Sequence, residues 1–189
     1  MSGLFGAGPQ VLLDDATGRI EYRPGVLSAA LASAWFETLH ASIDWRQQRR
    51  VMYERELDVP RLTASFPLDD PPLPSPLADA AALAGREFGT SFNAVGLNLY
   101  RDRGDSVAPH NDRLGDLEAG HPIVLLSLGA VRRMRIQHKA TRAKLELDLE
   151  PGSLLLMDFE SQKHYDHGIP KQRAAVGPRI SLAFRMRAR

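Results

Sequence analysis

The stretch "AVGLNLY", residues 94–100, marks the change that decides the fold. Its apolar residues at 95, 97 and 99 alternate with Gly96, Asn98 and Tyr100, so the two sets lie on opposite faces of a strand. Five more short strand-like runs follow between turn residues: "IVLLSLGA" (123–130), "RMRIQH" (133–138), "KLELDL" (144–149), "GSLLLMDF" (152–159) and "RISLAFR" (179–185). No helix-length pattern separates them, which argues against a parallel α/β sheet and predicts an antiparallel sandwich or barrel.

Before residue 90 the pattern is helical. Apolar residues recur at every fourth position, which predicts one helical face, with Ser28 as the cap: Leu27, Leu31, Trp35, Leu39 and Ile43. We therefore expect one domain over 1–189, with a helical N-terminal part and substrate-side loops (1–90) and a β core (91–189).

A second helix is predicted over "LADAAALAGREF", with Ser75 as its cap, Pro76 in its first turn and an end near Gly89. The five prolines of "FPLDDPPLPSP", residues 66–76, predict an extended surface loop before it.

Composition excludes several classes of protein. The chain has 189 residues and a net charge of +1, with no run of apolar residues long enough to span a membrane. It contains no cysteine, which rules out disulfides, thiolate nucleophiles and zinc–cysteine sites and fits a cytoplasmic location. We expect no secretory signal at "MSGLFGAGPQ". Basic clusters at 45–50, 131–135, 138–144 and the C-terminus could bind nucleic acid or lie solvated on the surface, and charge alone leaves both open.

The stretch "PHNDRLGD", residues 109–116, holds a candidate metal site. On an extended strand His110 and Asp112 project from one face, roughly 6–7 Å apart between Cα atoms. A third ligand could come from His164 or His167 in "SQKHYDHGIPK". Two histidines and one carboxylate form the facial triad suited to non-haem Fe(II), although zinc accepts the same ligands.

The last strand-like run, "RISLAFR", puts Arg179, Ser181 and Arg185 on one face. If the apolar residues between them pack into the shell, both arginines point into the barrel, where a buried guanidinium requires an anion such as a carboxylate. The alternative is an edge strand with both arginines in water.

Together these segments resemble the AlkB family of Fe(II)/2-oxoglutarate dioxygenases. The matching segments run in order from residue 60 to 185: "PRLTASF" (60–66), "NLYRDRGDSVAPHND" (98–112), "HPIVLLSLGAVRRM" (121–134), "PGSLLLM" (151–157), "YDHGIPK" (165–171) and "RISLAFR" (179–185). The resemblance implies a mainly β (α+β) fold, a double-stranded β-helix or jelly roll with N-terminal helices buttressing one sheet.

The resemblance also implies the roles of individual residues. The iron ligands would be His110, Asp112 and His167, the last chosen because "GIPK" follows it. Arg185 would pair with the distal carboxylate of 2-oxoglutarate, and Arg179 would lie near its metal-binding end. The other cosubstrate contacts would be Asn98, Tyr100 and Ser181, and the candidate substrate contacts are Arg61 and Asp116.

The activity implied by the resemblance is oxidative demethylation of N-alkylated bases in DNA or RNA. It would need Fe(II), with 2-oxoglutarate and O₂ as cosubstrates, and would release succinate, CO₂ and formaldehyde. The partner would be alkylated nucleic acid. The protein would be a cytoplasmic monomer that does not bind a membrane and has no obligate protein partner.

Two features depart from the family pattern. Members that act on cationic bases carry an acid directly after the metal aspartate, whereas Arg113 and Leu114 follow Asp112 here and Asp116 is the next acid. The region after "PRLTASF" also lacks the aromatic–glycine pair of the family's nucleotide-recognition lid. Two alternatives therefore stay open: the same chemistry on a protein or small molecule, and a non-catalytic jelly-roll module that binds metal or ligand.

Overall fold

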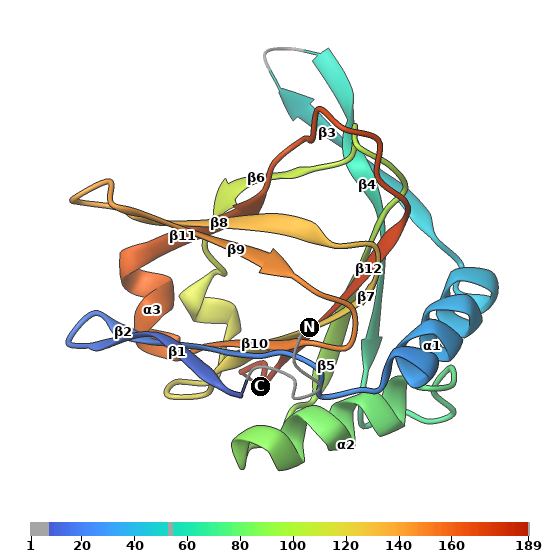
Figure 1. Cartoon of the computed structure of the whole chain (residues 1–189), viewed down its shortest axis with the longest axis horizontal. Coiled ribbons are helices and arrows are strands. Elements are labelled where there is room, and N and C mark those ends of the chain that lie inside the picture. Colours follow the sequence, from blue (N-terminus) through green and yellow to red (C-terminus); the bar gives the residue numbers. More distant parts are fainter. Residues whose placement is uncertain (1–7, 53–54, 189) are drawn as a thin grey trace, which may run out of the picture.

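The computed structural model describes residues 8–52 and 55–188, which form two antiparallel sheets facing each other (Figure 1). In the described chain the larger sheet has eight strands in the order β1-β2-β10-β7-β12-β5-β4-β3, and the smaller has four in the order β6-β11-β8-β9. Their bounds are β1 (Gln10–Asp15), β2 (Gly18–Arg23), β3 (Arg46–Met52), β4 (Arg55–Pro67), β5 (Ala94–Tyr100), β6 (Val107–His110), β7 (Ile123–Gly129), β8 (Arg132–His138), β9 (Lys144–Leu149), β10 (Leu154–Met157), β11 (Tyr165–Ile169) and β12 (Arg179–Arg185). This arrangement confirms the predicted jelly roll.

All six predicted strands exist, as β5, β7, β8, β9, β10 and β12. Strand β12 lies between β5 and β7, where Ser181 pairs with Asn98 on one side and Ser127 on the other. The edge-strand alternative for residues 179–185 is therefore wrong.

The alternation in β5 divides the fold into two apolar clusters. Val95, Leu97 and Leu99 pack outward with the helices, whereas Tyr100 packs inward between the sheets with residues such as Met134. Asn98 shares the inward face with Tyr100, so the polar positions of β5 line the barrel interior.

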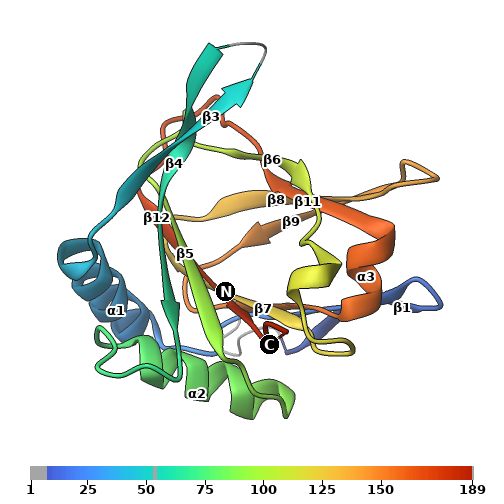
Figure 2. The same cartoon turned by 180° about the vertical axis from the view of Figure 1, so that it is seen from behind.

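Two helices cover the outer face of the larger sheet, as expected (Figure 2). Helix α1 (Ala29–Ser42) begins at Ser28, whose hydroxyl accepts a hydrogen bond from the Leu31 backbone N–H (3.3 Å). Leu27, Leu39 and Ile43 are buried as predicted, but Leu31 is 42% exposed, whereas Ala32 and Phe36 are buried in addition. A spacing of four residues advances 400° around a helix of 100° per residue, so a strict every-fourth stripe drifts off one face.

Helix α2 (Leu77–Phe88) ends at Gly89 as predicted, in a left-handed conformation with φ of +62°. The prediction for Ser75 is wrong, because Pro76 occupies the cap position and no side chain caps this helix. Two short helical segments, η1 (Leu114–Asp116) and α3 (Phe159–His164), were not predicted. Of the helices that the structure describes, none is long and apolar enough to cross a membrane.

The N-terminal part, expected to hold helices and substrate-side loops, also contains the four strands β1 to β4. Strand β4 pairs with β5 and β2 pairs with β10, so the N-terminal part shares a sheet with the β core and no boundary falls at residue 90. The charged run "GRIEYR" concealed β2. Its Glu21 is buried but lies 2.7 Å from the guanidinium groups of both Arg19 and Arg23, and this pairing allows a carboxylate in a buried strand.

Gly129, at the end of β7, generates a prediction about stability. Its φ is +82°, and a Cβ there would lie 2.5 Å from the Pro178 carbonyl oxygen and 2.8 Å from the Phe36 ring. Gly129→Ala should lower the free energy of unfolding by about 2–4 kcal/mol, measured by chemical denaturation, since backbone strain and overpacking add.

Gly120→Ala is the matched control, because Gly120 has a φ of +78° and open space around its Cβ position. It should cost only about 1 kcal/mol, the contribution of the backbone conformation alone. Equal losses in the two variants would contradict the close-contact argument.

Candidate metal centre

Two strands of the smaller sheet bring the predicted metal ligands together. His110 ends β6 and pairs directly with His167 on the neighbouring strand β11, with their ring centroids 4.6 Å apart. Asp112 follows two residues after His110. One ligand atom from each of the three residues lies within 4.8 Å of the others, so the three could hold a single ion.

His164, the other candidate, lies elsewhere. It ends α3, where its Nε2 is 3.3 Å from the Glu160 carboxylate and its ring stacks on His138. The structure therefore groups His167, and not His164, with the first two ligands.

The protonation states of the group suit a divalent cation. His167 is 7% exposed, and burial first, then the neighbouring His110, lowers its pKa to about 3, so the imidazole is neutral at physiological pH. The Nδ1 of His110 lies 2.9 Å from the Ala108 carbonyl oxygen. Donation to that carbonyl would leave its Nε2 with the lone pair that a metal needs.

Arg185 fixes the charge of the third ligand. Burial alone would raise the pKa of the Asp112 carboxyl, but hydrogen bonds and charge from Arg185 outweigh it and hold the pKa below its usual value. Both Nε and Nη2 of Arg185 donate to this carboxylate, the second over 3.2 Å. Asp112 is therefore ionised, which is the form that binds metal.

The second arginine of β12 lies deep in the barrel. Arg179 is 1% exposed and donates to the Ser127 hydroxyl (2.8 Å), and its guanidinium carbon lies 5.4 Å from the centroid of the Tyr100 ring. Burial lowers its pKa to about 10, so it stays cationic at neutral pH. Its Nε and Nη1 are buried and have no hydrogen-bond partner among the described residues. A buried cation with two unused donors fits a carboxylate such as that of 2-oxoglutarate.

The two arginines lie in the opposite order to the one expected from the resemblance. Arg185 contacts the metal ligand Asp112, so it is the arginine at the metal end. Arg179 is six residues away, roughly 20 Å along the strand, so it marks the distal end of the interior. The sequence puts both on one face but does not reveal which strand end the metal loop approaches.

The other predicted contacts are divided between the interior and the surface. Asn98, Tyr100 and Ser181 line the inner face of the larger sheet, and Arg61 joins them by donating from Nε to the Asn98 side-chain oxygen (2.7 Å). Asp116 lies exposed in η1. The roles of these residues in binding cosubstrate or substrate stay predictions.

The basic cluster at 131–135 is divided, because Arg132 is buried whereas Arg133 and Arg135 lie in exposed ion pairs. The guanidinium groups of Arg133 and Arg135 lie 2.8 Å and 2.7 Å from the carboxylates of Asp148 and Glu146 on the neighbouring strand β9. For these residues the structure favours a solvated surface over a free cationic face.

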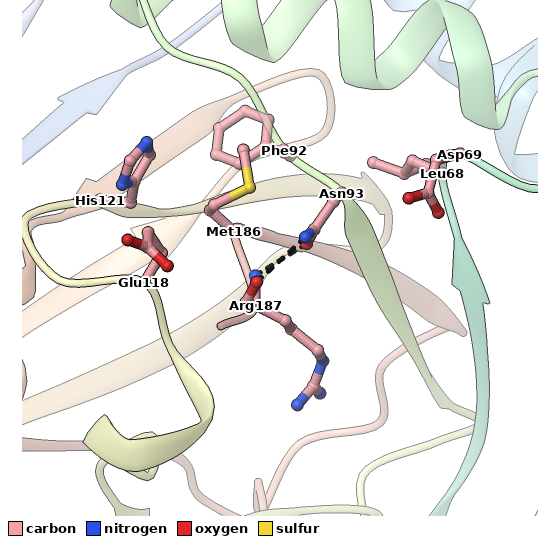
Figure 3. A pocket seen from close by; sticks show the side chains of 8 residues that line it. All are labelled: Leu68, Asp69, Phe92, Asn93, Glu118, His121, Met186 and Arg187. Carbon is pink, nitrogen blue, oxygen red and sulfur yellow. Dashed lines mark hydrogen bonds between the residues drawn. The ribbon is translucent and has the colours of Figure 1, made fainter. Parts of the chain in front are cut away.

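A cavity of about 330 Å³ lies at the ends of β4, β5 and β12, beside the loop that follows Asp112 (Figure 3). Its lining combines apolar and charged side chains: Leu68, Asp69, Phe92, Asn93, Glu118, His121, Met186 and Arg187. A second cavity of about 270 Å³ shares Arg187 with it and reaches Arg185 and Gly96. We name the pair the mouth cavities. No sequence pattern pointed to Glu118 or His121, although they are the next titratable residues after Asp116.

Comparison with known proteins identifies the family. The model of the 2OG-Fe(II) oxygenase superfamily matches residues 67–185. A similar solved structure, described as "The structure of OsALKBH1", has a TM-score of 0.64 at 12% identity and covers 94% of this chain and 100% of its own, which supports the fold.

Curated relatives add sequence similarity. The chain is 35% identical over 105 residues to the human DNA oxidative demethylase ALKBH2, covering 51% of this chain and 40% of that protein. It is 29% identical over 182 residues to the alpha-ketoglutarate-dependent dioxygenase alkB homolog 3 of Bos taurus, covering 86% of this chain and 64% of that protein. The chain thus spans about 40% to 64% of the length of these relatives.

These matches confirm the resemblance to AlkB proteins. The two histidines and the carboxylate fit Fe(II), and the unpaired donors of Arg179 fit 2-oxoglutarate, the ligands from which the matching family takes its name. The chain belongs to the 2OG-Fe(II) oxygenase superfamily.

Proposed function

We propose that this protein is an Fe(II)/2-oxoglutarate-dependent demethylase that removes N-alkyl groups from bases in DNA or RNA, releasing succinate, CO₂ and formaldehyde. The observation that carries the chemistry is the juxtaposition of His110, Asp112 and His167 at one end of a barrel whose other end holds Arg179 with two unused donors. The relatives named DNA oxidative demethylase support nucleic acid as the substrate.

The metal and the cosubstrate would be bound by different residues along β12. Fe(II) bound by the three ligands would supply the oxidation, with 2-oxoglutarate and O₂ as cosubstrates. Arg179 would bind the distal carboxylate of 2-oxoglutarate. Arg185 would keep the Asp112 carboxylate ionised and oriented, and the inner faces of Asn98, Tyr100 and Ser181 would form the wall of the cosubstrate site.

The two arginines should respond differently to the same substitution. Arg179→Met should raise the dissociation constant for 2-oxoglutarate about a hundredfold, because loss of one partner of a buried charge pair costs about 3 kcal/mol or more, and should leave Co(II) affinity unchanged. Arg185→Met should weaken Co(II) binding itself, because burial then raises the Asp112 pKa without the hydrogen bonds and charge of Arg185 to oppose it. Calorimetric titrations of each variant check both values. A stronger loss of 2-oxoglutarate binding in Arg185→Met, with Co(II) affinity intact, would restore the order that the resemblance implied.

The activity itself is tested by a screen of methylated single- and double-stranded DNA and RNA. We expect one class to lose its methyl group, detected by mass spectrometry, with formaldehyde and succinate released in equal amounts and only when Fe(II) and 2-oxoglutarate are present. His167→Ala should be inactive, and His164→Ala, a histidine three residues earlier and outside the metal group, should retain activity. Consumption of 2-oxoglutarate without demethylation of any nucleic acid would contradict the nucleic-acid substrate and favour a protein or small-molecule substrate.

For substrate recognition we propose Glu118, which lies in the larger of the mouth cavities, in place of Asp116. A carboxylate there faces the aromatic and thioether side chains of Phe92 and Met186, surroundings in which a cationic ring could lie (Figure 3). Asp69 adds a second carboxylate to the same cavity. These acids would supply the negative charge that is missing directly after Asp112.

Glu118→Gln should therefore lower kcat/KM for a cationic base such as 1-methyladenine about tenfold, a loss of about 1.4 kcal/mol in transition-state stabilisation. It should leave kcat/KM for the neutral base 3-methylthymine unchanged. Asp116→Asn is the matched control and should affect neither base. The reverse result, with the cationic base sensitive only to Asp116→Asn, would return the role to Asp116.

We further propose that the protein acts in the cytoplasm as a monomer with no obligate protein partner. The lack of cysteine fits a reducing compartment. Sedimentation of the purified protein at several concentrations tests the monomer directly, and a dimer that persists on dilution would contradict it.

A further inference from the structure

A buried glutamine contacts the metal centre without belonging to it. Gln162 lies in α3, is 1% exposed, and has its side-chain oxygen Oε1 3.2 Å from the backbone nitrogen of Asp112. A backbone N–H only donates, so the group that faces it must be the amide oxygen of Gln162. The contact joins residues 50 positions apart in the sequence.

Asp112 depends on such a contact because of where it lies. Strand β6 ends at His110 and η1 begins at Leu114, so Asp112 occupies an irregular connection whose backbone is not held by strand pairing. Arg185 holds the carboxylate end of the residue. The bond from the Asp112 backbone N–H to Gln162 holds the other end.

Gln162 is itself firmly placed beside the third ligand. Helix α3 leads directly into β11, and His167 follows Gln162 by five residues. The ammonium group of Lys139 donates to the backbone carbonyls of Gln162 (2.9 Å) and Lys163 (3.1 Å). The Lys139 backbone N–H donates to the backbone carbonyl of His164 (2.8 Å). These bonds fix the end of α3 to the end of β8, which pairs with β11.

We propose that Gln162 is a positioning residue of the metal centre. Its side-chain oxygen ties the segment that carries Asp112 to the segment that carries His167, and thereby sets the ligand geometry before the metal binds. The inference rests on the proposed metal centre and assigns to Gln162 no contact with the metal or the substrate. Residues one contact removed from a metal typically change its affinity about 10–100-fold when they are replaced.

The test compares Gln162→Met, which keeps the length of the side chain but removes the oxygen, with Gln162→Glu, which keeps an oxygen acceptor. The dissociation constant for Co(II), an oxygen-stable substitute for Fe(II), is measured by calorimetry, and the unfolding temperature of the metal-free protein is measured alongside. Gln137→Met is the matched control, because Gln137 lies in β8, the strand that pairs with the His167 strand β11, and donates to the Arg142 carbonyl (3.0 Å).

We expect Gln162→Met to weaken Co(II) binding about tenfold or more, Gln162→Glu to bind at least tenfold more tightly than Gln162→Met, and the control to match the wild type. A residue that only filled space would give the opposite order, since methionine packs well in a buried site and a carboxylate does not. The unfolding temperature should therefore be higher for Gln162→Met than for Gln162→Glu, although Co(II) affinity should be higher for Gln162→Glu.

Two results would overturn the inference while leaving the metal centre intact: wild-type affinity in Gln162→Met, or an equal loss in the Met and Glu variants. Failure of the wild-type protein to bind Co(II) would overturn the metal centre itself, and with it the proposed function. The wild-type titration therefore separates the two failures.

Discussion

The pairing of β6 with β11 is the constraint on which the site depends. It puts His110 directly opposite His167, and Asp112 then needs only two further residues to complete the group. Gly168 permits this pairing, because a Cβ there would lie 2.9 Å from the Val107 carbonyl oxygen and 3.0 Å from the Pro109 nitrogen. A side chain at this position would push β6 away from β11 and separate the two imidazoles. The glycine after His167 thus serves the metal centre through backbone spacing alone.

The side chains of β12 alternate between a face that stabilises the fold and a face that lines the site. Its apolar side chains, among them Phe184, pack with the helices in the outer cluster, whereas Arg179, Ser181 and Arg185 face the interior. Because the strand is central in the sheet, a shift of one residue would expose the apolar face to the cavity and bury two guanidinium groups among aliphatic side chains. The packing that stabilises the larger sheet therefore also fixes the distance between the metal end and the distal end of the site.

The sequence predicted those parts of the fold where a single rule of side-chain placement operates. Strands β5, β8, β9 and β12 alternate, whereas β7 and β10 are short apolar runs between turn residues. Helix α1 begins at Ser28 and helix α2 ends at Gly89 for local backbone reasons. Strands β6 and β11 escaped detection because they have only four and five residues and carry the polar ligands. The sequence also could not predict which of the two arginines lies at the metal end of β12. Alternation assigns a face, but only the tertiary path of the loop through Asp112 decides which end of β12 the metal approaches.

The distribution of carboxylates separates two tasks that a run of acids after the metal aspartate would combine. Asp112 is held by an arginine of the central strand, whereas Glu118 and Asp69 extend from connections at the barrel mouth. A charged residue in a loop can be moved or replaced without disturbing strand register. Binding residues are concentrated in loops for that reason. Arg113, exposed beside the ligand, would weaken a cationic substrate's attraction to that point of the rim. The charge of the substrate would then be recognised in the larger mouth cavity, where Phe92 and Met186 lie between the two acids (Figure 3).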